Sequence, residues 1–178
     1  MLLNHAQKRI KELFDRDQQD RSPRSIRRPY PDRHRFIHIQ RRDIGRIAEV
    51  NTILKNDPVL RGIDYFRAGF MYQHGGAVVY VRKAKGLAEQ AVKRGYQPAR
   101  WLVAAATDRI LTMQGKPQKF GTQFRKDVTG QWLIFPTQRS TTDAQRRQYR
   151  VAPWAEIQRT LDILNQKPDH SPILKRLG

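Results

Sequence analysis

The sequence predicts a mainly α-helical protein: a single-domain helical bundle with one solenoid-like helix-turn-helix unit and one small β-hairpin. Two observations favour this fold class. Apolar residues recur every three or four positions through most of the chain, which is the spacing of a helix with one buried face. After Pro117 the pattern changes to alternation over a short stretch, which is the spacing of a strand. The length of 178 residues also suits one domain with its own core.

The N-terminal part combines one helix with an arm of different composition. Residues 1–20 form the predicted N-terminal helix, because the apolar residues between 2 and 19 share one face. Residues 21–39 form a basic arm whose prolines disfavour helix, so we expect an extended segment. Arginines interleaved with aromatic residues can neutralise phosphates and stack on bases, although a solvated linker is the alternative. The candidate nucleic-acid-binding residues are Arg24, Arg27, Arg28, Arg33 and Arg35.

Residues 40–165 form the predicted helical core with the hairpin inside it. Apolar stripes separated by glycine or proline predict four helices, at 40–55, 62–74, 77–94 and 98–114. Small residues between Ala84 and Ala106 favour close packing of two of these helices as a helix-turn-helix. One such unit is too few for a repeat array.

The C-terminal third contains the hairpin, two more helices and a tail. The hairpin is predicted near residues 119–135, with its turn at Asp127-Val128-Thr129-Gly130. A short helix follows from 143 to 150, and Pro153 begins the last helix. Residues 166–178 lack periodicity, and we expect a loose tail.

The charge balance is informative about partners. The chain has 35 Lys and Arg against 16 Asp and Glu, a formal net charge of +19. Such an excess favours a polyanion, RNA or DNA first, with an acidic protein or an anionic membrane surface as alternatives. A basic but non-binding surface is the remaining explanation.

Several classes of chemistry are excluded or disfavoured. Without cysteine there is no disulfide, no thiolate zinc site and no thiol nucleophile. The chain carries no phosphate-binding glycine loop, no His-Glu-x-x-His and no Gly-x-Ser-x-Gly, so neither a metal nor a cofactor is expected. No run approaches the roughly 20 apolar residues of a membrane span, and the start does not resemble a signal peptide, which makes a cytoplasmic location the default expectation.

The candidate catalytic residues are His74, Asp108 and Arg109. His74 ends an apolar stripe at a helix C-terminus, where a histidine can serve as general acid or base. Asp108 shares the inward face of its helix, so its carboxylate needs a cation or several N–H donors. Arg109, His74 or the amides of residues 121–123 could supply them. A purely structural role is the alternative for both His74 and Asp108.

A second group of residues is expected to bind substrate. Gly121 inside a predicted strand indicates close approach of a ligand or of another backbone. Gln118 and Gln123 offer amide donors and acceptors that suit an amide, a base edge or a sugar. Thr122 lies between them.

These residues also resemble a widespread bacterial domain-of-unknown-function family. The likeness covers roughly residues 13–158 and rests on a Gln-His pair, an Asp-Arg pair and a Gly-x-x-Gln-x-Tyr-Gly-Thr-Gln block, with Phe120 here in place of the tyrosine. An Asp…Arg pair near the N-terminus and another near the C-terminus complete the likeness. The matching residues are Gln73, His74, Asp108, Arg109, Gly115, Gln118, Phe120, Gly121, Thr122 and Gln123, with Asp17, Arg21, Asp143 and Arg147 in the outer elements. The resemblance implies a mainly helical fold with a hairpin, adds Gln73 and Arg147 to the expected substrate-binding residues, and brings no established activity.

Three functions therefore compete. The first is a small hydrolase or transferase acting on an anionic substrate, with nucleic acid as one candidate, in which His74 is the general acid/base and Asp108 orients it. The second is a non-catalytic nucleic-acid-binding module. The third is a helical adaptor for another protein.

Overall fold

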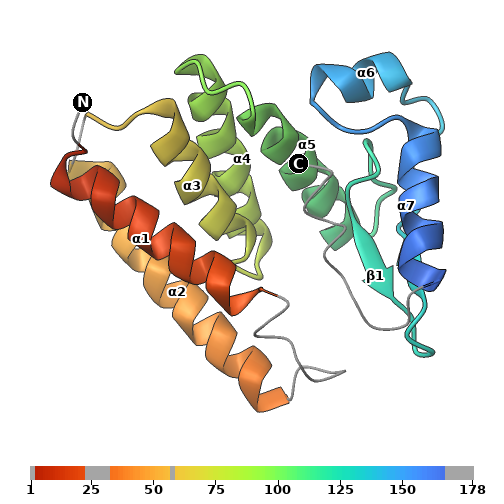
Figure 1. The fold of residues 1–178 in the computed structure, drawn as a ribbon, viewed down its shortest axis with the longest axis horizontal. Coiled ribbons are helices and arrows are strands. Elements are labelled where there is room, and N and C mark those ends of the chain that lie inside the picture. Colours follow the sequence, from red (N-terminus) through yellow and green to blue (C-terminus); the bar gives the residue numbers. More distant parts are fainter. Residues whose placement is uncertain (1–2, 23–32, 57–58, 167–178) are drawn as a thin grey trace. The chain divides into compact units, whose positions relative to one another are not determined.

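The computed structural model describes residues 3–22, 33–56 and 59–166 (Figure 1), and only the backbone of residues 33–36. This part of the protein is mainly α-helical, as predicted, with one small antiparallel sheet. The chain divides into two compact units, residues 1–99 and 100–178. The boundary falls at the first residues of a helix, α5 (Ala99–Met113), and no proline- or glycine-rich linker marks it in the sequence.

The first unit consists of four helices. They are α1 (His5–Asp20), α2 (Arg33–Asn56), α3 (Gly62–Gln73) and α4 (Val78–Lys93). Helix α3 is the central element, because it packs against each of the other three, and most extensively against α4. Helices α1 and α2 lie side by side and run in opposite directions (Figure 1).

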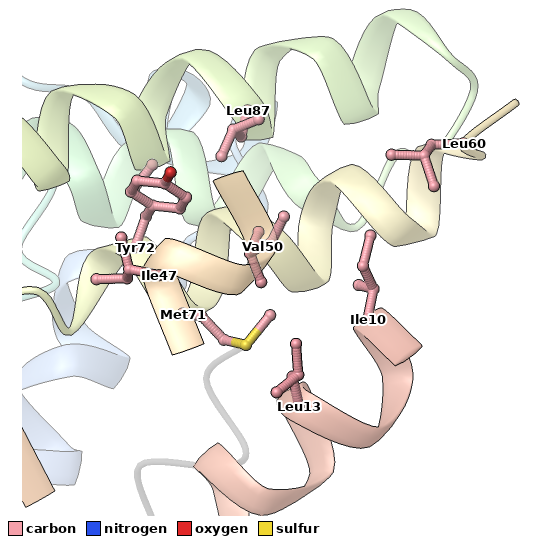
Figure 2. Close-up of a cluster of buried hydrophobic side chains, with 10 residues drawn as sticks. Ile10, Leu13, Ile47, Val50, Leu60, Met71, Tyr72 and Leu87 are labelled. Atoms are coloured by element: carbon pink, nitrogen blue, oxygen red, sulfur yellow. The ribbon is translucent and has the colours of Figure 1, made fainter. Parts of the chain in front are cut away.

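The core of this unit forms where α1, α2 and α3 meet (Figure 2). Leu13 of α1 points toward Met71 of α3, and Ile10 of α1 points toward the side of Leu60. Each such side chain contributes roughly 1.5–3 kcal/mol when fully buried. The other buried members of this cluster are Ile47, Val50, Ala68, Tyr72, Ala84 and Leu87.

Helix α2 differs from its prediction at its start and in its buried face. It begins at Arg33 rather than at residue 40, so residues 33–39 are helical and not part of an extended arm. The last proline of the arm is Pro31, and proline restricts the residues before it rather than those after it. The apolar stripe that predicted this helix is not its whole buried face: Ile44 is 54% exposed, whereas Asp43 and Arg46 are buried.

The turn between α3 and α4 requires its two glycines. His74 is the residue that caps α3, and its amide donates to the carbonyl of Met71. Gly75 lies against the Tyr80 ring so closely that an added Cβ would stand 2.7 Å from it. Gly76 has φ +75°, a left-handed conformation that glycine adopts without steric cost. These two glycines therefore allow the chain to leave α3 and turn toward α4.

The second unit combines helices with the hairpin. Apart from α5 it contains β1 (Phe124–Lys126), β2 (Trp132–Ile134), α6 (Asp143–Gln148) and α7 (Trp154–Gln166). The strands are antiparallel, with Phe124 opposite Ile134 and Lys126 opposite Trp132. Its core contains Ala104, Phe120, Val151 and Ile157, with half-buried aromatic side chains packed around them.

The hairpin is present where predicted, but its first strand is shorter. Residues 118–123 form an irregular loop, and β1 begins only at Phe124. The reason lies in side chains: buried polar groups bind several amides of this loop, so these amides do not enter a strand ladder. The helix-turn-helix expected between 84 and 106 joins helices that belong mainly to different units.

Two predicted segments lie mostly outside the described residues: 23–32 of the basic arm and 167–178 of the C-terminal tail. Across the described ranges, no helix has both the length and the apolar character needed to cross a membrane.

Candidate functional site

The predicted site residues are divided between the two units. Gln73 and His74 belong to the first unit, at the end of α3. The others belong to the second unit: Asp108, Arg109, Gln118, Gly121, Thr122, Gln123 and Arg147. Of the arm, Arg33 and Arg35 are part of α2, while Arg24, Arg27 and Arg28 lie outside the described residues.

The carboxylate that contacts His74 is that of Asp17, from α1. The His74 Nδ1 atom lies 3.1 Å from Asp17 Oδ1, and Phe70, one turn back on α3, packs edge-on against the imidazole ring. Asp17 is 1% exposed, and the His74 side chain is 17% exposed. The sequence suggested Asp108 as the group orienting His74, but the carboxylate at the imidazole is that of Asp17, because α1 packs on α3 and this packing brings a residue 57 positions away to the ring.

The Asp17–His74 pair is part of a network of ion pairs. Arg21 donates to Asp17 at 2.7 Å and to Asp43 at 2.5 Å, and it thereby joins α1 to α2. Arg46 donates to Asp43 at 2.9 Å and also contacts Asp20. Arg42, the third arginine, pairs with Asp20 at 3.0 Å. Three carboxylates thus face three guanidinium groups, and each buried charge has the partner that burial demands.

The network affects the hydrogen bonding of the His74 ring and the pKa of Asp20. An ionised carboxylate only accepts hydrogen bonds, so the Nδ1 atom of His74 must carry the proton that points to Asp17. A neutral imidazole in this arrangement has its lone pair on Nε2, the atom that a histidine general base uses. Burial raises the pKa of Asp20, but the hydrogen bonds from Arg46 and Arg42 outweigh burial and hold that pKa below its ordinary value.

In the second unit, Asp108 holds the loop that follows α5. Its side chain is completely buried. Oδ1 accepts from the amides of Lys119 at 2.7 Å and Phe120 at 2.9 Å, and Oδ2 accepts from the amide and the hydroxyl of Thr122, both at 2.9 Å. Four donors match the four lone-pair positions of a carboxylate. The sequence left several partners open for Asp108, and the structure shows that backbone amides of the loop bind it. Asp108 therefore holds this loop in place.

Two glutamines complete the loop. Gln118 is fully buried: its Nε2 donates to the carbonyls of Gln123 and Phe135, and its Oε1 accepts from the Gln123 amide at 2.9 Å. Gln123 donates through Nε2 to the Ala105 carbonyl at 3.3 Å and to the Thr122 hydroxyl at 3.1 Å. Gln118 therefore braces the backbone, whereas Gln123 borders a pocket.

Two features of the backbone at residue 121 favour glycine: its conformation and the close approach of another element. Its φ is +92°, and an added Cβ would meet Ile157 and Trp154 of α7 at 3.2 Å. The predicted close approach exists, but side chains of α7 make it.

Arg146 anchors the other side of the loop. This side chain is buried and donates to the carbonyls of Phe120 and Thr141 and to the Asp143 carboxylate. The hydrogen bond from the Trp154 amide, followed by that from Arg146, lowers the pKa of Asp143. Arg147, expected to bind substrate, is exposed on α6, and Arg109 is half-buried on α5.

A pocket of about 320 Å³ lies within the second unit, beside the loop. Its volume is at the lower end of the range for small-molecule sites. The walls are mainly apolar and include three aromatic rings. The lining residues are Trp101, Gly121, Thr122, Gln123, Phe124, Trp132, Val151, Ala152 and Ile157.

Cationic side chains lie over aromatic rings on the hairpin. The Lys126 ammonium stands 5.1 Å from the centre of the Trp132 ring, and the Arg125 guanidinium stands 5.7 Å from that of Phe135. Both cations are exposed, and neither forms an ion pair with a carboxylate of the described residues. Between residues 100 and 166 there are 11 Lys and Arg against 5 Asp and Glu.

Sequence reasoning missed Asp43, Arg46 and Arg146 and the two tryptophans of the pocket. One signal was available for the first pair: Asp43 and Arg46 are three residues apart and in phase with Ile47 and Val50, which places charges on the buried stripe of α2. For Trp101 and Trp132 there was no comparable signal, because a half-buried tryptophan has the same pattern whether it packs or lines a pocket.

Comparison of the chain with protein-family models, with curated proteins and with solved structures finds no match. The resemblance noted from the motifs therefore stays a prediction.

Proposed function

We propose that the protein binds nucleic acid through the exposed cations of its hairpin, Lys126 on one face of the strands and Arg125 on the other. The observation that carries the proposal is the pairing of exposed cations with aromatic rings: Lys126 over Trp132 and Arg125 over Phe135. Cations that neutralise phosphates beside aromatic faces that stack on bases are the combination that single-stranded nucleic-acid-binding surfaces use. An acidic protein partner would account for the cations but gives no reason for the rings.

The distribution of carboxylates supports the same proposal. In the described residues, most acidic side chains pair with a Lys or Arg of their own surroundings, so they do not form an acidic face that would repel a polyanion. The carboxylates in such ion pairs are Glu12, Asp15, Asp17, Asp20, Asp43, Glu49, Asp64, Glu89 and Asp143. The excess positive charge of +19 is then available to an external anion.

The test is the salt dependence of binding to a fluorescently labelled single-stranded oligonucleotide, measured by anisotropy. Affinity should fall steeply as salt rises from about 50 to 200 mM, because binding releases condensed counterions. The double variant Arg125→Gln/Lys126→Gln should weaken binding and reduce the slope of log K against log salt by roughly 1.4, two contacts at about 0.7 each.

A matched control removes the same amount of charge elsewhere. Lys11 and Lys85 each pair with a carboxylate four residues away on their own helix. The variant Lys11→Gln/Lys85→Gln has the same net charge as the hairpin variant, and its salt slope should stay near that of the parent. If the two double variants lose affinity equally, the hairpin is not the interface and only net charge matters.

A second function is favoured by the contact between His74 and Asp17. A buried carboxylate that fixes the Nδ1–H tautomer leaves Nε2 as the base that could take a proton from water or a hydroxyl group. On this proposal the protein is a hydrolase or transferase acting on an anionic substrate. His74→Ala should abolish turnover of single-stranded RNA while binding persists, and His5→Ala, an exposed histidine at the start of α1, should not. Turnover unchanged in His74→Ala would refute catalysis by this residue.

A further inference from the structure

We infer that the pocket of the second unit takes one unstacked base of a bound single strand. This inference rests on the proposed function and adds to it the part of the ligand that is recognised. The pocket holds about 320 Å³ and is lined by Trp101, Trp132 and Phe124. Every base has a π-face that stacks on such rings, whereas the mainly apolar walls offer nothing to a phosphate.

The pocket carries one side chain suited to a base edge. Gln123 donates through its Nε2 to the Ala105 carbonyl and to the Thr122 hydroxyl. These bonds use the two N–H groups of its carboxamide, so the group it can offer a ligand is the Oε1 carbonyl oxygen. This acceptor matches the amino or imino N–H that each base presents on its pairing edge.

The wall that carries Gln123 is held in place before any ligand arrives. The Asp108 carboxylate binds the amides of Lys119, Phe120 and Thr122, and Gln118 binds both the amide and the carbonyl of Gln123. A wall fixed in this way loses little conformational freedom on binding, which favours affinity.

The part of the pocket lining formed by Trp132 is held by α7. The Asn165 side chain accepts from the Trp132 amide at 2.8 Å and donates to its carbonyl at 3.1 Å. Both parts of the lining are therefore braced by buried or paired polar groups.

The cations adjoining the pocket are placed along the chain next to its lining residues. Arg125 and Lys126 follow Phe124, and Arg150 precedes Val151. All three are exposed. Arg150 has φ +58°, a left-handed conformation that is uncommon for a residue other than glycine and that often marks a functional segment. Of the two hairpin cations, Lys126 shares the strand face of Phe124 and Trp132, so it is the one placed to meet a phosphate next to the inserted base.

The test compares two strands of equal charge. One is a short single-stranded oligonucleotide with bases, and the other has the same length with abasic residues; both are prepared as RNA and as DNA. The full-length protein should bind the base-bearing strand about tenfold more tightly, a conservative value for one stacked base. A preference between RNA and DNA identifies which strand is the ligand.

Two variants locate the effect. Ala152→Phe fills the pocket without removing a contact, and Trp132→Ala removes one ring. Each should abolish the preference for the base-bearing strand over the abasic strand. The matched control is Val128→Phe, which adds the same ring in the hairpin turn, where Val128 is fully exposed, and it should keep the preference. Thermal unfolding checks that each variant is folded.

The outcomes separate the two proposals. If neither strand binds, the proposed nucleic-acid function fails, and the pocket inference fails with it. If both strands bind equally, or if Ala152→Phe weakens both alike, nucleic-acid binding stands and the pocket inference is overturned. The pocket inference is also overturned if an aromatic peptide binds tightly in the pocket without displacing either strand. The ligand of the pocket would then be a protein.

Discussion

Replacing Asp108 tests the central feature of the second unit, a carboxylate that binds four donors of one loop. Asp108→Ala leaves the amides of Lys119, Phe120 and Thr122 and one hydroxyl without their acceptor. An unsatisfied buried donor costs about 1–3 kcal/mol. Two of the three amides are only partly buried, so water can bond to them and offset part of this cost. We therefore expect the free energy of unfolding to fall by about 3–5 kcal/mol. Asp108→Asn keeps one acceptor oxygen and should lose about 2 kcal/mol.

The assay can observe this unit alone. The three tryptophans, Trp101, Trp132 and Trp154, all belong to the second unit, so intrinsic fluorescence reports its unfolding and not that of the first unit. Urea unfolding followed by this fluorescence gives the free energy from the midpoint and slope. Amide hydrogen exchange at residues 119, 120 and 122 provides a direct second readout, because these protons should exchange faster in both variants.

The control is Asp162→Asn, an exposed position on α7, which should stay within about 0.5 kcal/mol of the parent. If Asp108→Ala also stays within about 1 kcal/mol and its loop amides remain protected, the tethering argument is wrong.

Three further predictions concern other residues. Gly121→Ala should destabilise the second unit by about 2 kcal/mol in the same urea assay, because alanine disfavours φ +92° and its methyl group would meet α7 at 3.2 Å; unchanged stability would contradict this. Asp17→Ala should destabilise the first unit by about 3–5 kcal/mol, since it removes one partner of a buried ion network. His74→Ala should cost less than half as much, because the arginine pairs of Asp17 remain; far-UV circular dichroism during thermal unfolding compares the two. The folded pKa values of Asp20 and Asp143 are lowered, so the stability that they contribute is complete above about pH 4, the unfolded pKa, and is lost as the pH falls through the folded values. A melting temperature that is constant between about pH 5 and 2 would contradict this.

The secondary structure was largely readable from the sequence because it depends on short-range patterns. An apolar stripe predicted a helix at residues 62–74, and the observed α3 ends at Gln73, one residue before the predicted end. The turn that ends at Gly130 predicted the hairpin, which is present. Each of these signals acts within about one turn of helix or a few residues of strand, which is the range over which a sequence pattern specifies backbone conformation.

Two errors show where short-range patterns fail. The proline-rich arm was extended to residue 39, although nothing after Pro31 prevents a helix. Phe120 and Thr122 alternate like strand residues, yet they lie in a loop, because a buried carboxylate from α5 competes for their amides more effectively than a neighbouring strand does.

The sequence by itself determined the helical class, the hairpin, the excess of positive charge and the need of Asp108 for several donors. Only the tertiary structure decided which groups meet. Asp17 reaches His74 because α1 packs on α3, and Trp101 lines a pocket with Trp132 because the hairpin folds back beside the start of α5. These contacts join residues tens of positions apart, and the burial that selects them depends on how whole elements pack, which no local spacing records.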